Sequence, residues 1–384
     1  MKKNGIIIAF FLVLGFPLVG LIIDKNVKLN GYIDDIPVID ANWKNVGDGT
    51  YQDFLGRKWE NSFPGRKIML KTRNQILYSF FNVSPNENVI IGKDKSLFEP
   101  LYILNDLQVN GPEEEDFFEQ LGDKLQRIDM CLRENDKELY IFISPSKAEF
   151  EADKIPNKYL FLSNEDYYTY TNYQMLIKTL DEYNIRYFDS VGYIKQDTSQ
   201  GLYGSPVFTN TGIHWTNAYG RESASKLVNY INSNSKYDLG ELTVVEFDSD
   251  RPANPDTDLY DSLNLLFPPK GEWHSTILRV DRESEKPNVF IRGGSFTFQS
   301  LNAINESGVF DQFVHISNNK CFVNSYSNSI SMSTYDSYDE IELDEMIGNS
   351  DIVILEVNEA IIPNMSFGLI DYLIQYPEYL DSNY

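Results

Sequence analysis

The sequence predicts an α/β protein in which helices cover both faces of a mostly parallel sheet, preceded by an N-terminal transmembrane helix. Along most of the 384 residues, short apolar segments alternate with longer segments whose apolar residues recur at three- and four-residue steps. Such alternation is typical of parallel strands joined by amphipathic helices, an arrangement with three α/β/α layers. An uninterrupted apolar run near the N-terminus predicts the membrane helix.

The N-terminal segment is predicted to anchor the protein. As a helix, the apolar residues 5–23 would extend about 28 Å, close to the hydrocarbon thickness of a bilayer. Lys2 and Lys3 precede this run, which favours a cytoplasmic N-terminus. The end of the run does not resemble a signal-peptidase site, so residues 1–25 are expected to stay as a signal anchor. We therefore expect a single-pass protein of the cell membrane whose remaining chain is extracytoplasmic.

The rest of the chain divides into a stalk and one large domain. Residues 26–61 have little periodicity and are predicted to form a stalk and lead-in, whereas residues 62–384 suffice for one α/β domain. Apolar side chains recur on one face, and so predict helices, over residues 66–81, 117–132, 164–183, 216–232 and 296–304. Short apolar runs predict strands over residues 89–91, 97–103, 139–143, 185–188, 289–291, 313–316 and 351–357.

Charge and composition exclude several classes of partner. The formal net charge of −24 disfavours nucleic acid and other anionic polymers as tightly held partners, because each contact would add repulsion. Cys131 and Cys321 are the two cysteines, and they form either one disulfide or two free thiols. The three histidines are scattered, and neither His-x-His nor Cys-x-x-Cys occurs. The sequence therefore predicts no catalytic metal and no cofactor.

A candidate nucleophile follows the predicted strand 289–291. Gly293 and Gly294 permit a sharp turn, after which Ser295 lies near the start of a predicted helix. Parallel sheets bind ligands at the carboxyl ends of their strands, and amides at a helix N-terminus can stabilise an oxyanion. Because Gly-Gly-Ser is also an ordinary turn, the assignment needs a second observation.

A base for this serine is available in His214. It precedes an amphipathic stretch and is expected on a loop at a helix N-terminus, where functional side chains are often displayed. A serine hydroxyl needs an imidazole within hydrogen-bond distance to act as a nucleophile at neutral pH. His274 is expected in a polar loop and His315 in a strand, where a structural role fits better.

Six segments in order resemble one known family, the SGNH hydrolase-like domain of alginate O-acetyltransferases of the AlgJ/AlgX type. They are similar to its FP-R helix, its GKDGWLF segment, its P-K and LP pair, its D-x-HWT motif, its GDSF serine and its closing WEFPER strand. The segments are Phe63-Pro64-Gly65-Arg66, Val89-Ile90-Ile91-Gly92-Lys93-Asp94 with Leu97-Phe98, Ser144-Pro145-Ser146-Lys147 with Ile155-Pro156, His214-Trp215-Thr216, Gly294-Ser295-Phe296 and Ile354-Leu355-Glu356-Val357-Asn358-Glu359.

The resemblance implies roles for these residues. Ser295 falls on the family's nucleophile and His214 on its general base, in an SGNH-hydrolase-like O-acetyltransferase. Backbone N–H groups of Gly294 and Ser295 are then expected to stabilise the tetrahedral oxyanion.

Three further residues are candidates for contact with substrate. Trp215 adjoins the predicted base and Tyr219 lies one turn further along, so both are expected to wall the site, where aromatic faces stack on sugar rings. Lys147 follows the predicted strand 139–143 and is a candidate for binding a substrate or acyl carbonyl. A solvated loop lysine is the simpler interpretation of Lys147.

The acid that would orient the imidazole is missing from its expected position. The resemblance places an aspartate two residues before the histidine, where this chain has Gly212. Asp258, and after it Asp256, are candidate replacements in the acidic loop 254–261. The simpler interpretation of each is a turn or helix-capping residue.

The leading functional hypothesis is an extracytoplasmic, membrane-anchored O-acetyltransferase. An acetyl group would pass through Ser295 to hydroxyls of a cell-surface or secreted polysaccharide, and the resemblance implies a membrane-bound O-acyltransferase as the partner that supplies it. A carbohydrate acetyl esterase would use the same residues with water as acceptor. A non-catalytic polysaccharide-binding or scaffold protein of an export complex is the third hypothesis, and Gly212 is its main support.

Overall fold

The computed structural model describes residues 36–164, 167–196, 206–281, 285–318, 321–326 and 330–380, with residues 26–31 and scattered positions among the first 25. The predicted signal anchor therefore lies mostly outside the described residues. Within the described part of the chain, no helix combines the length and apolar character needed to cross a membrane.

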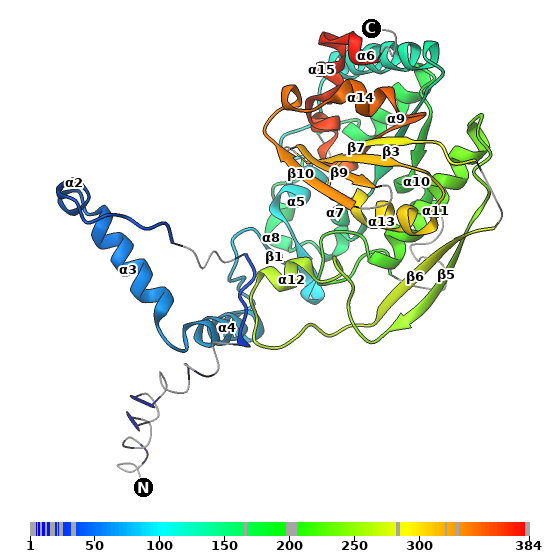
Figure 1. Cartoon of the computed structure of the whole chain (residues 1–384). Helices are drawn as coiled ribbons and strands as arrows, with labels where there is room; N and C mark the ends of the chain where they lie inside the picture. Colours follow the sequence, from blue (N-terminus) through cyan, green and yellow to red (C-terminus); the bar gives the residue numbers. More distant parts are fainter. Residues whose placement is uncertain are drawn as a thin grey trace. The chain divides into compact units, whose positions relative to one another are not determined.

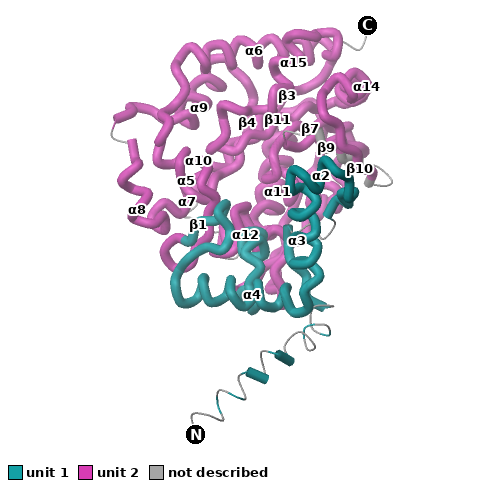
Figure 2. Tube along the Cα trace, turned by 90° about the vertical axis from the view of Figure 1, so that its left-hand side faces the viewer, with its two compact units in different colours: residues 1–91, 258–270 teal, residues 92–257, 271–384 magenta. Residues whose placement is uncertain are grey.

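The chain divides into two compact units (Figure 2). The small unit comprises residues 1–91 and 258–270, and the large unit comprises residues 92–257 and 271–384. The boundaries that the sequence predicts at residues 25 and 61 stay predictions.

The small unit is helical. Its elements are α2 (Trp43–Gly47), α3 (Thr50–Ser62), α4 (Arg66–Ile76), the π-helical turn η2 (Leu77–Phe81), β1 (Ile90–Ile91) and α12 (Asp258–Ser262). The side-chain amide of Asn74 on α4 donates to the carbonyl of Leu263 at 2.9 Å, and the ammonium of Lys71 donates to that of Leu265 at 3.3 Å. These bonds join α4 to the distant segment 258–270.

The large unit is built on a seven-stranded sheet, as far as the described residues show. Its strands are β3 (Glu138–Ser144), β4 (Tyr187–Asp189), β7 (Val289–Gly293), β8 (Phe313–Ser317), β9 (Cys321–Tyr326), β10 (Ile330–Tyr335) and β11 (Ile352–Asn358), in the order β10-β9-β8-β7-β11-β3-β4. The five strands from β8 to β4 are parallel, whereas β9 and β10 add an antiparallel edge. This confirms the predicted α/β class with a mostly parallel sheet.

Helices cover both faces of the sheet (Figure 1). On one face, α6 (Glu115–Glu134), α9 (Asn172–Glu182), α14 (Leu343–Gly348) and α15 (Leu369–Gln375) share one apolar core with Leu139, Ile141 and Ile143 of β3. The alternate residues of β3 point the other way, so Tyr140 packs against Tyr230 of α11 (Asn217–Asn234). Helix α13 (Thr297–Ser307) packs against α11 in that layer.

The remaining elements of the large unit are short or lie outside this sheet. They are η3 (Lys93–Lys95), β2 (Leu97–Phe98), α5 (Pro100–Asp106), α7 (Lys147–Phe150), η4 (Ala152–Lys154), α8 (Asn157–Leu160), α10 (Ser190–Gln196), β5 (Leu242–Ser249), β6 (Trp273–Val280), η6 (Tyr338–Glu340), η7 (Glu359–Gly368) and η8 (Pro377–Leu380).

Two predictions about single segments differ from the structure, and the structure decides a third that the sequence left open. The strand expected at 97–103 stops at Phe98, because Pro100 begins α5 at a position where its missing N–H is not needed. His274 lies on β6 rather than in a loop, with its Nδ1 3.1 Å from a carboxylate oxygen of Glu246 on β5. Cys131 on α6 is a free thiol.

Candidate active site

The turn after β7 presents Ser295. Strand β7 lies between β11 and β8 near the middle of the sheet, and α13 begins two residues after Ser295. A Cβ on Gly293 would come within 2.8 Å of the Cβ of Glu356 on β11, so no other residue fits there without displacement. The serine side chain is partly exposed, as a nucleophile that meets a substrate must be.

Ser295 and His214 meet in space. The Nε2 atom of His214 lies 2.7 Å from the Oγ of Ser295, although the residues are 81 apart in sequence. Both side chains are partly exposed. The prediction that they meet is confirmed, and their catalytic roles stay a prediction.

Local structure fixes the position of His214. The next residue but one, Thr216, caps α11 by accepting the N–H of Tyr219 at 3.0 Å, which stabilises the start of the helix. The rings of His214 and Phe296 have centroids 4.7 Å apart. The imidazole therefore sits at the N-terminus of α11, as predicted, beside the residue that follows the serine.

A buried lysine organises the loop before His214. Lys147 is fully buried, and its ammonium donates to the carbonyls of Leu97, Thr209 and Gly212 at 2.7–2.8 Å. An ammonium has three N–H groups, so all of them are used. The expectation that Lys147 binds substrate is therefore wrong, as is its interpretation as a solvated lysine.

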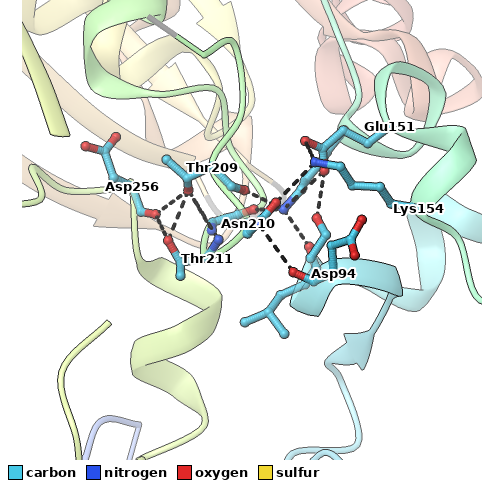
Figure 3. Close-up of polar contacts among 11 residues, drawn as sticks. Asp94, Glu151, Lys154, Thr209, Asn210, Thr211 and Asp256 are labelled. Carbon is cyan, nitrogen blue, oxygen red and sulfur yellow. Dashed lines mark hydrogen bonds and ion pairs between the residues drawn. The ribbon is translucent and has the colours of Figure 1, made fainter. Parts of the chain in front are cut away.

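Polar side chains hold the same loop on its other sides (Figure 3). The side-chain amide of Asn210 donates to the carbonyl of Asp94 at 3.3 Å and accepts from Lys154 at 3.1 Å. The hydroxyls of Thr209 and Thr211 both donate to the backbone carbonyl of Asp256, at 2.5 and 2.7 Å. The loop is thus fixed by partners from several parts of the large unit.

Trp215 and Tyr219 do not wall the site. Trp215 is fully buried, and its indole N–H donates to the carbonyl of Phe296 at 3.1 Å and to Gln299 at 3.2 Å. Tyr219 is only 3% exposed. Neither ring has a free face for a sugar, so their predicted role in substrate binding is wrong. Trp215 instead packs against Phe142 of β3, with ring centroids 6.0 Å apart, and Tyr219 packs against Trp215.

Gly212 leaves no room for the aspartate that the resemblance expects. A Cβ at this position would lie 2.9 Å from the carbonyl oxygen of Pro255 and 3.1 Å from that of Asp256. The backbone of the acidic loop thus occupies the space that a side chain would need.

Asp256, one candidate replacement, has a structural role. Its side chain is buried, with Oδ1 accepting the N–H of Asn217 at 2.8 Å and Oδ2 that of Ala253 at 3.2 Å. The first bond places a negative charge at the N-terminus of α11, where it interacts favourably with the helix dipole. Asp256 thus agrees with the simpler, helix-capping interpretation.

Asp258 belongs to the small unit. It begins α12, where its Oδ1 accepts the N–H of Leu259 at 2.7 Å. Its predicted role as the partner of His214 stays a prediction.

Glu356 is a residue of this site that the sequence reasoning missed. It lies on β11 and is 1% exposed, with Oε2 accepting the N–H of Gly294 at 2.7 Å and Oε1 accepting the hydroxyl of Ser144 at 2.5 Å. Burial raises the pKa of this carboxyl, and the two hydrogen bonds and the charges of Arg292 and His214 oppose the rise. A glutamate inside the apolar run Ile354 to Val357 was the signal that could have found it.

The bond to Glu356 changes the expected oxyanion site. Since the N–H of Gly294 already donates to a carboxylate, it is not available to an oxyanion in this structure. The N–H of Ser295 donates to no acceptor among the described residues. Of the two donors predicted, Ser295 is the one that the geometry leaves open.

Two further buried groups stabilise the turn from its other side. Arg292 is fully buried and donates to the carbonyls of Ile316 and Asn318 at 2.9 and 2.6 Å. His315 on β8 is also buried, and its Nε2 lies 2.9 Å from the hydroxyl of Thr297. Burial, with the charge of Arg292, lowers the pKa of His315 to about 3, so it is neutral and structural.

The fold and the site together define a class: an α/β protein with a mostly parallel sheet and a serine-histidine pair at the carboxyl end of its central strands. No protein-family model matches the chain. No curated protein sequence matches it either.

Several solved structures are similar to the chain. The O-acetyltransferase domain of Pseudomonas putida AlgJ has 15% identity and a TM-score of 0.44, over 72% of this chain and 92% of that one. Pseudomonas aeruginosa AlgX has 12% identity and a TM-score of 0.43, over 74% of this chain and 67% of that one. Bacillus cereus PatB1 with a sulfonyl adduct has 12% identity and a TM-score of 0.46, over 72% of this chain and 97% of that one. Similarity at this level assigns no activity to the chain.

Proposed function

We propose that the protein is a serine-dependent O-acetyltransferase that acts on a polysaccharide outside the cytoplasm. The observation that carries the proposal is the 2.7 Å contact between His214 and Ser295 at the carboxyl end of β7. The order of the six segments that resemble alginate O-acetyltransferases supports acetyl transfer as the reaction.

The first half of the reaction forms an acetyl-enzyme. The Oγ of Ser295 attacks the carbonyl carbon of an acetyl donor while Nε2 of His214 takes the hydroxyl proton. The N–H of Ser295 stabilises the oxyanion of the tetrahedral intermediate, a contribution of about 3 kcal/mol per donor in other acyl-transfer enzymes. When the intermediate collapses, the proton passes from His214 to the leaving group, and an acetyl ester remains on Ser295.

The second half transfers the acetyl group. A sugar hydroxyl attacks the ester carbonyl as His214 takes its proton, and collapse returns that proton to the Oγ of Ser295. Water in place of the sugar would give an acetyl esterase, so the acceptor alone separates these two activities.

The membrane and donor parts of the proposal rest on the N-terminal sequence and the family resemblance. The apolar run 5–23 is proposed to anchor the protein, with the large unit outside the cytoplasm. A membrane-bound O-acyltransferase is proposed to bring acetyl groups across the membrane to Ser295.

The proposal is tested by trapping the acetyl-enzyme. Incubation with p-nitrophenyl acetate should place one acetyl group on Ser295, detected by mass spectrometry of the intact protein and its peptides. Ser295→Ala should abolish the adduct and lower turnover by several orders of magnitude, whereas Ser307→Ala, further along α13, should change neither.

The product shows whether a sugar or water accepts the acetyl group. Acetylated polysaccharide indicates transfer, and free acetate alone indicates an esterase. The absence of any adduct on Ser295 with several acetyl donors would reject both activities and favour the scaffold hypothesis.

A further inference from the structure

A second polar pocket lies at the carboxyl ends of β3, β4 and β11. It has a volume of about 170 Å³, and its lining includes Asn105, Ser146, Glu149, Asn172, Lys195 and Glu359. Neither Ser295 nor His214 belongs to its described lining. Ligands of parallel sheets bind at this end of the strands, so the position suits a binding site.

The pocket offers hydrogen-bond donors and acceptors side by side. The amide nitrogen of Asn105 donates to the carbonyl of Ala360 at 2.5 Å, which leaves its amide oxygen as an acceptor. Asn172 has the opposite arrangement, since its oxygen accepts the N–H of Glu113 at 2.7 Å and its nitrogen remains as a donor. An alternation of donors and acceptors matches the hydroxyl groups of a sugar.

Glu359 adds a donor to this set. One of its carboxyl oxygens accepts the N–H of Ser146 at 2.6 Å. Burial, and then the negative charge of Glu149, raise the pKa of Glu359 to about 8, so the carboxyl keeps its proton at neutral pH and its other oxygen can donate.

The other charges at the pocket are net negative, because its described lining has one cation, Lys195, against the carboxylates of Glu149 and Asp106. Lys195 is paired with Glu149 at 2.5 Å and Tyr173 donates to Asp189 at 2.7 Å, while Asp106 contributes a further carboxylate. A ligand with a carboxylate would be repelled by this set, whereas an uncharged ligand would not.

We propose that this pocket binds a single uncharged sugar unit through its hydroxyl groups. Its volume is below the range of roughly 300–1,000 Å³ typical of pockets for drug-sized ligands, which suits one ring rather than an oligosaccharide. On the basis of the proposed function, the sugar is a unit of the polysaccharide that receives the acetyl group.

One short segment links the pocket to the serine turn. The hydroxyl of Ser144 donates to Glu356, which holds the N–H of Gly294, and two residues later the N–H of Ser146 donates to Glu359. Asn358 fixes the segment between them by donating to the carbonyl of Pro145 at 2.7 Å. The pocket and the nucleophile are thus supported by the same three residues, as expected for two parts of one substrate-binding surface.

The test measures binding of small sugars to the full chain. Saturation-transfer NMR is recorded with methyl β-D-glucopyranoside, glucosamine and glucuronate as separate probes at pH 7. The uncharged glucoside should bind and glucuronate should not. Binding of glucosamine alone would overturn the proposal in favour of a cation site, and binding of no probe would overturn it as well.

Two substitutions at one position separate recognition from folding. Glu359→Gln keeps an acceptor for Ser146 and a donor for the ligand, so it should retain binding, whereas Glu359→Ala should weaken binding at least about tenfold, as expected for the loss of one or more hydrogen bonds. Wild-type binding should weaken as the pH rises through about 8, because Glu359 loses its donor proton, and binding to Glu359→Gln should not. Unchanged binding in Glu359→Ala would overturn the assignment.

Labelling of Ser295 by phenylmethylsulfonyl fluoride, measured on the same samples, distinguishes this proposal from the proposed function. Labelling without sugar binding would overturn the sugar site alone. Sugar binding that depends on Glu359 without labelling would support the site and count against the serine chemistry.

Discussion

Glu356 is the residue on which the serine turn depends most directly. Glu356→Ala would leave the buried N–H of Gly294 and the hydroxyl of Ser144 without their acceptor, and each such loss costs about 1–3 kcal/mol. We expect a clear drop in the free energy of unfolding, measured by urea titration, and slower acetylation of Ser295. Glu356→Gln keeps an oxygen acceptor and nearly the same volume, so it should retain more of the stability and of the acetylation rate than Glu356→Ala. Wild-type stability in Glu356→Ala would contradict this view of the turn.

The acid that orients His214 can be found by substitution. If Asp258 has this role, Asp258→Asn should lower the acetylation rate on the order of 10³-fold or more, since the imidazole would lose the partner that fixes its tautomer. Asp261→Asn, in the same helix α12, is the matched control and should have little effect. Equal rates in the two variants would discard Asp258.

Asp256 should respond differently from Asp258. Because its carboxylate accepts the N–H of Asn217 at the start of α11, Asp256→Ala should destabilise the protein by about 0.5–2 kcal/mol, the usual cost of a lost helix cap. Thermal unfolding followed by circular dichroism measures this loss. A variant of normal stability would show that the bond to Asn217 contributes nothing to the fold.

Among elements, the loop before His214 depends on α7 through one buried cation. Lys147→Met keeps much of the side-chain volume but leaves the carbonyls of Leu97, Thr209 and Gly212 without a donor. We expect at least about 3 kcal/mol of lost stability and slower acetylation, because the loop that positions the base is released. Lys158→Met, at an exposed position of α8, should change neither the stability nor the acetylation rate.

The sequence predicted elements better than it predicted the site. Buried apolar runs identified β3, β7 and β11, because strands covered on both faces carry a continuous signal. The Ser295 and His214 assignments came from local motifs and meet as expected. The buried position of Lys147 could not be predicted from a local motif, since the carbonyls that bind it lie 50–65 residues away in sequence. Trp215 and Tyr219 were misplaced because adjacency to a base does not tell which way a side chain points.

At the scale of the whole molecule, the carboxyl of Glu359 predicts how stability depends on pH. The pKa of Glu359 is raised from 4.5 to about 8 in the folded state, so the folded state holds this proton more tightly than the unfolded state does. Its contribution to stability is fully present below pH 4.5 and is lost as the pH rises to about 8. Glu359→Gln removes this dependence, so the wild type should lose stability relative to the variant across that range. A constant difference in urea midpoints between pH 5 and 8 would contradict the assignment.

The discontinuity of the small unit sets an order for its synthesis and folding. Helix α4 bonds to residues 263 and 265, which the ribosome makes about 190 residues later. By that time the chain of β3, β4 and α11 has already been made. The small unit therefore completes its bonds only late in translation, and a fragment released after residue 91 would lack part of its own structure.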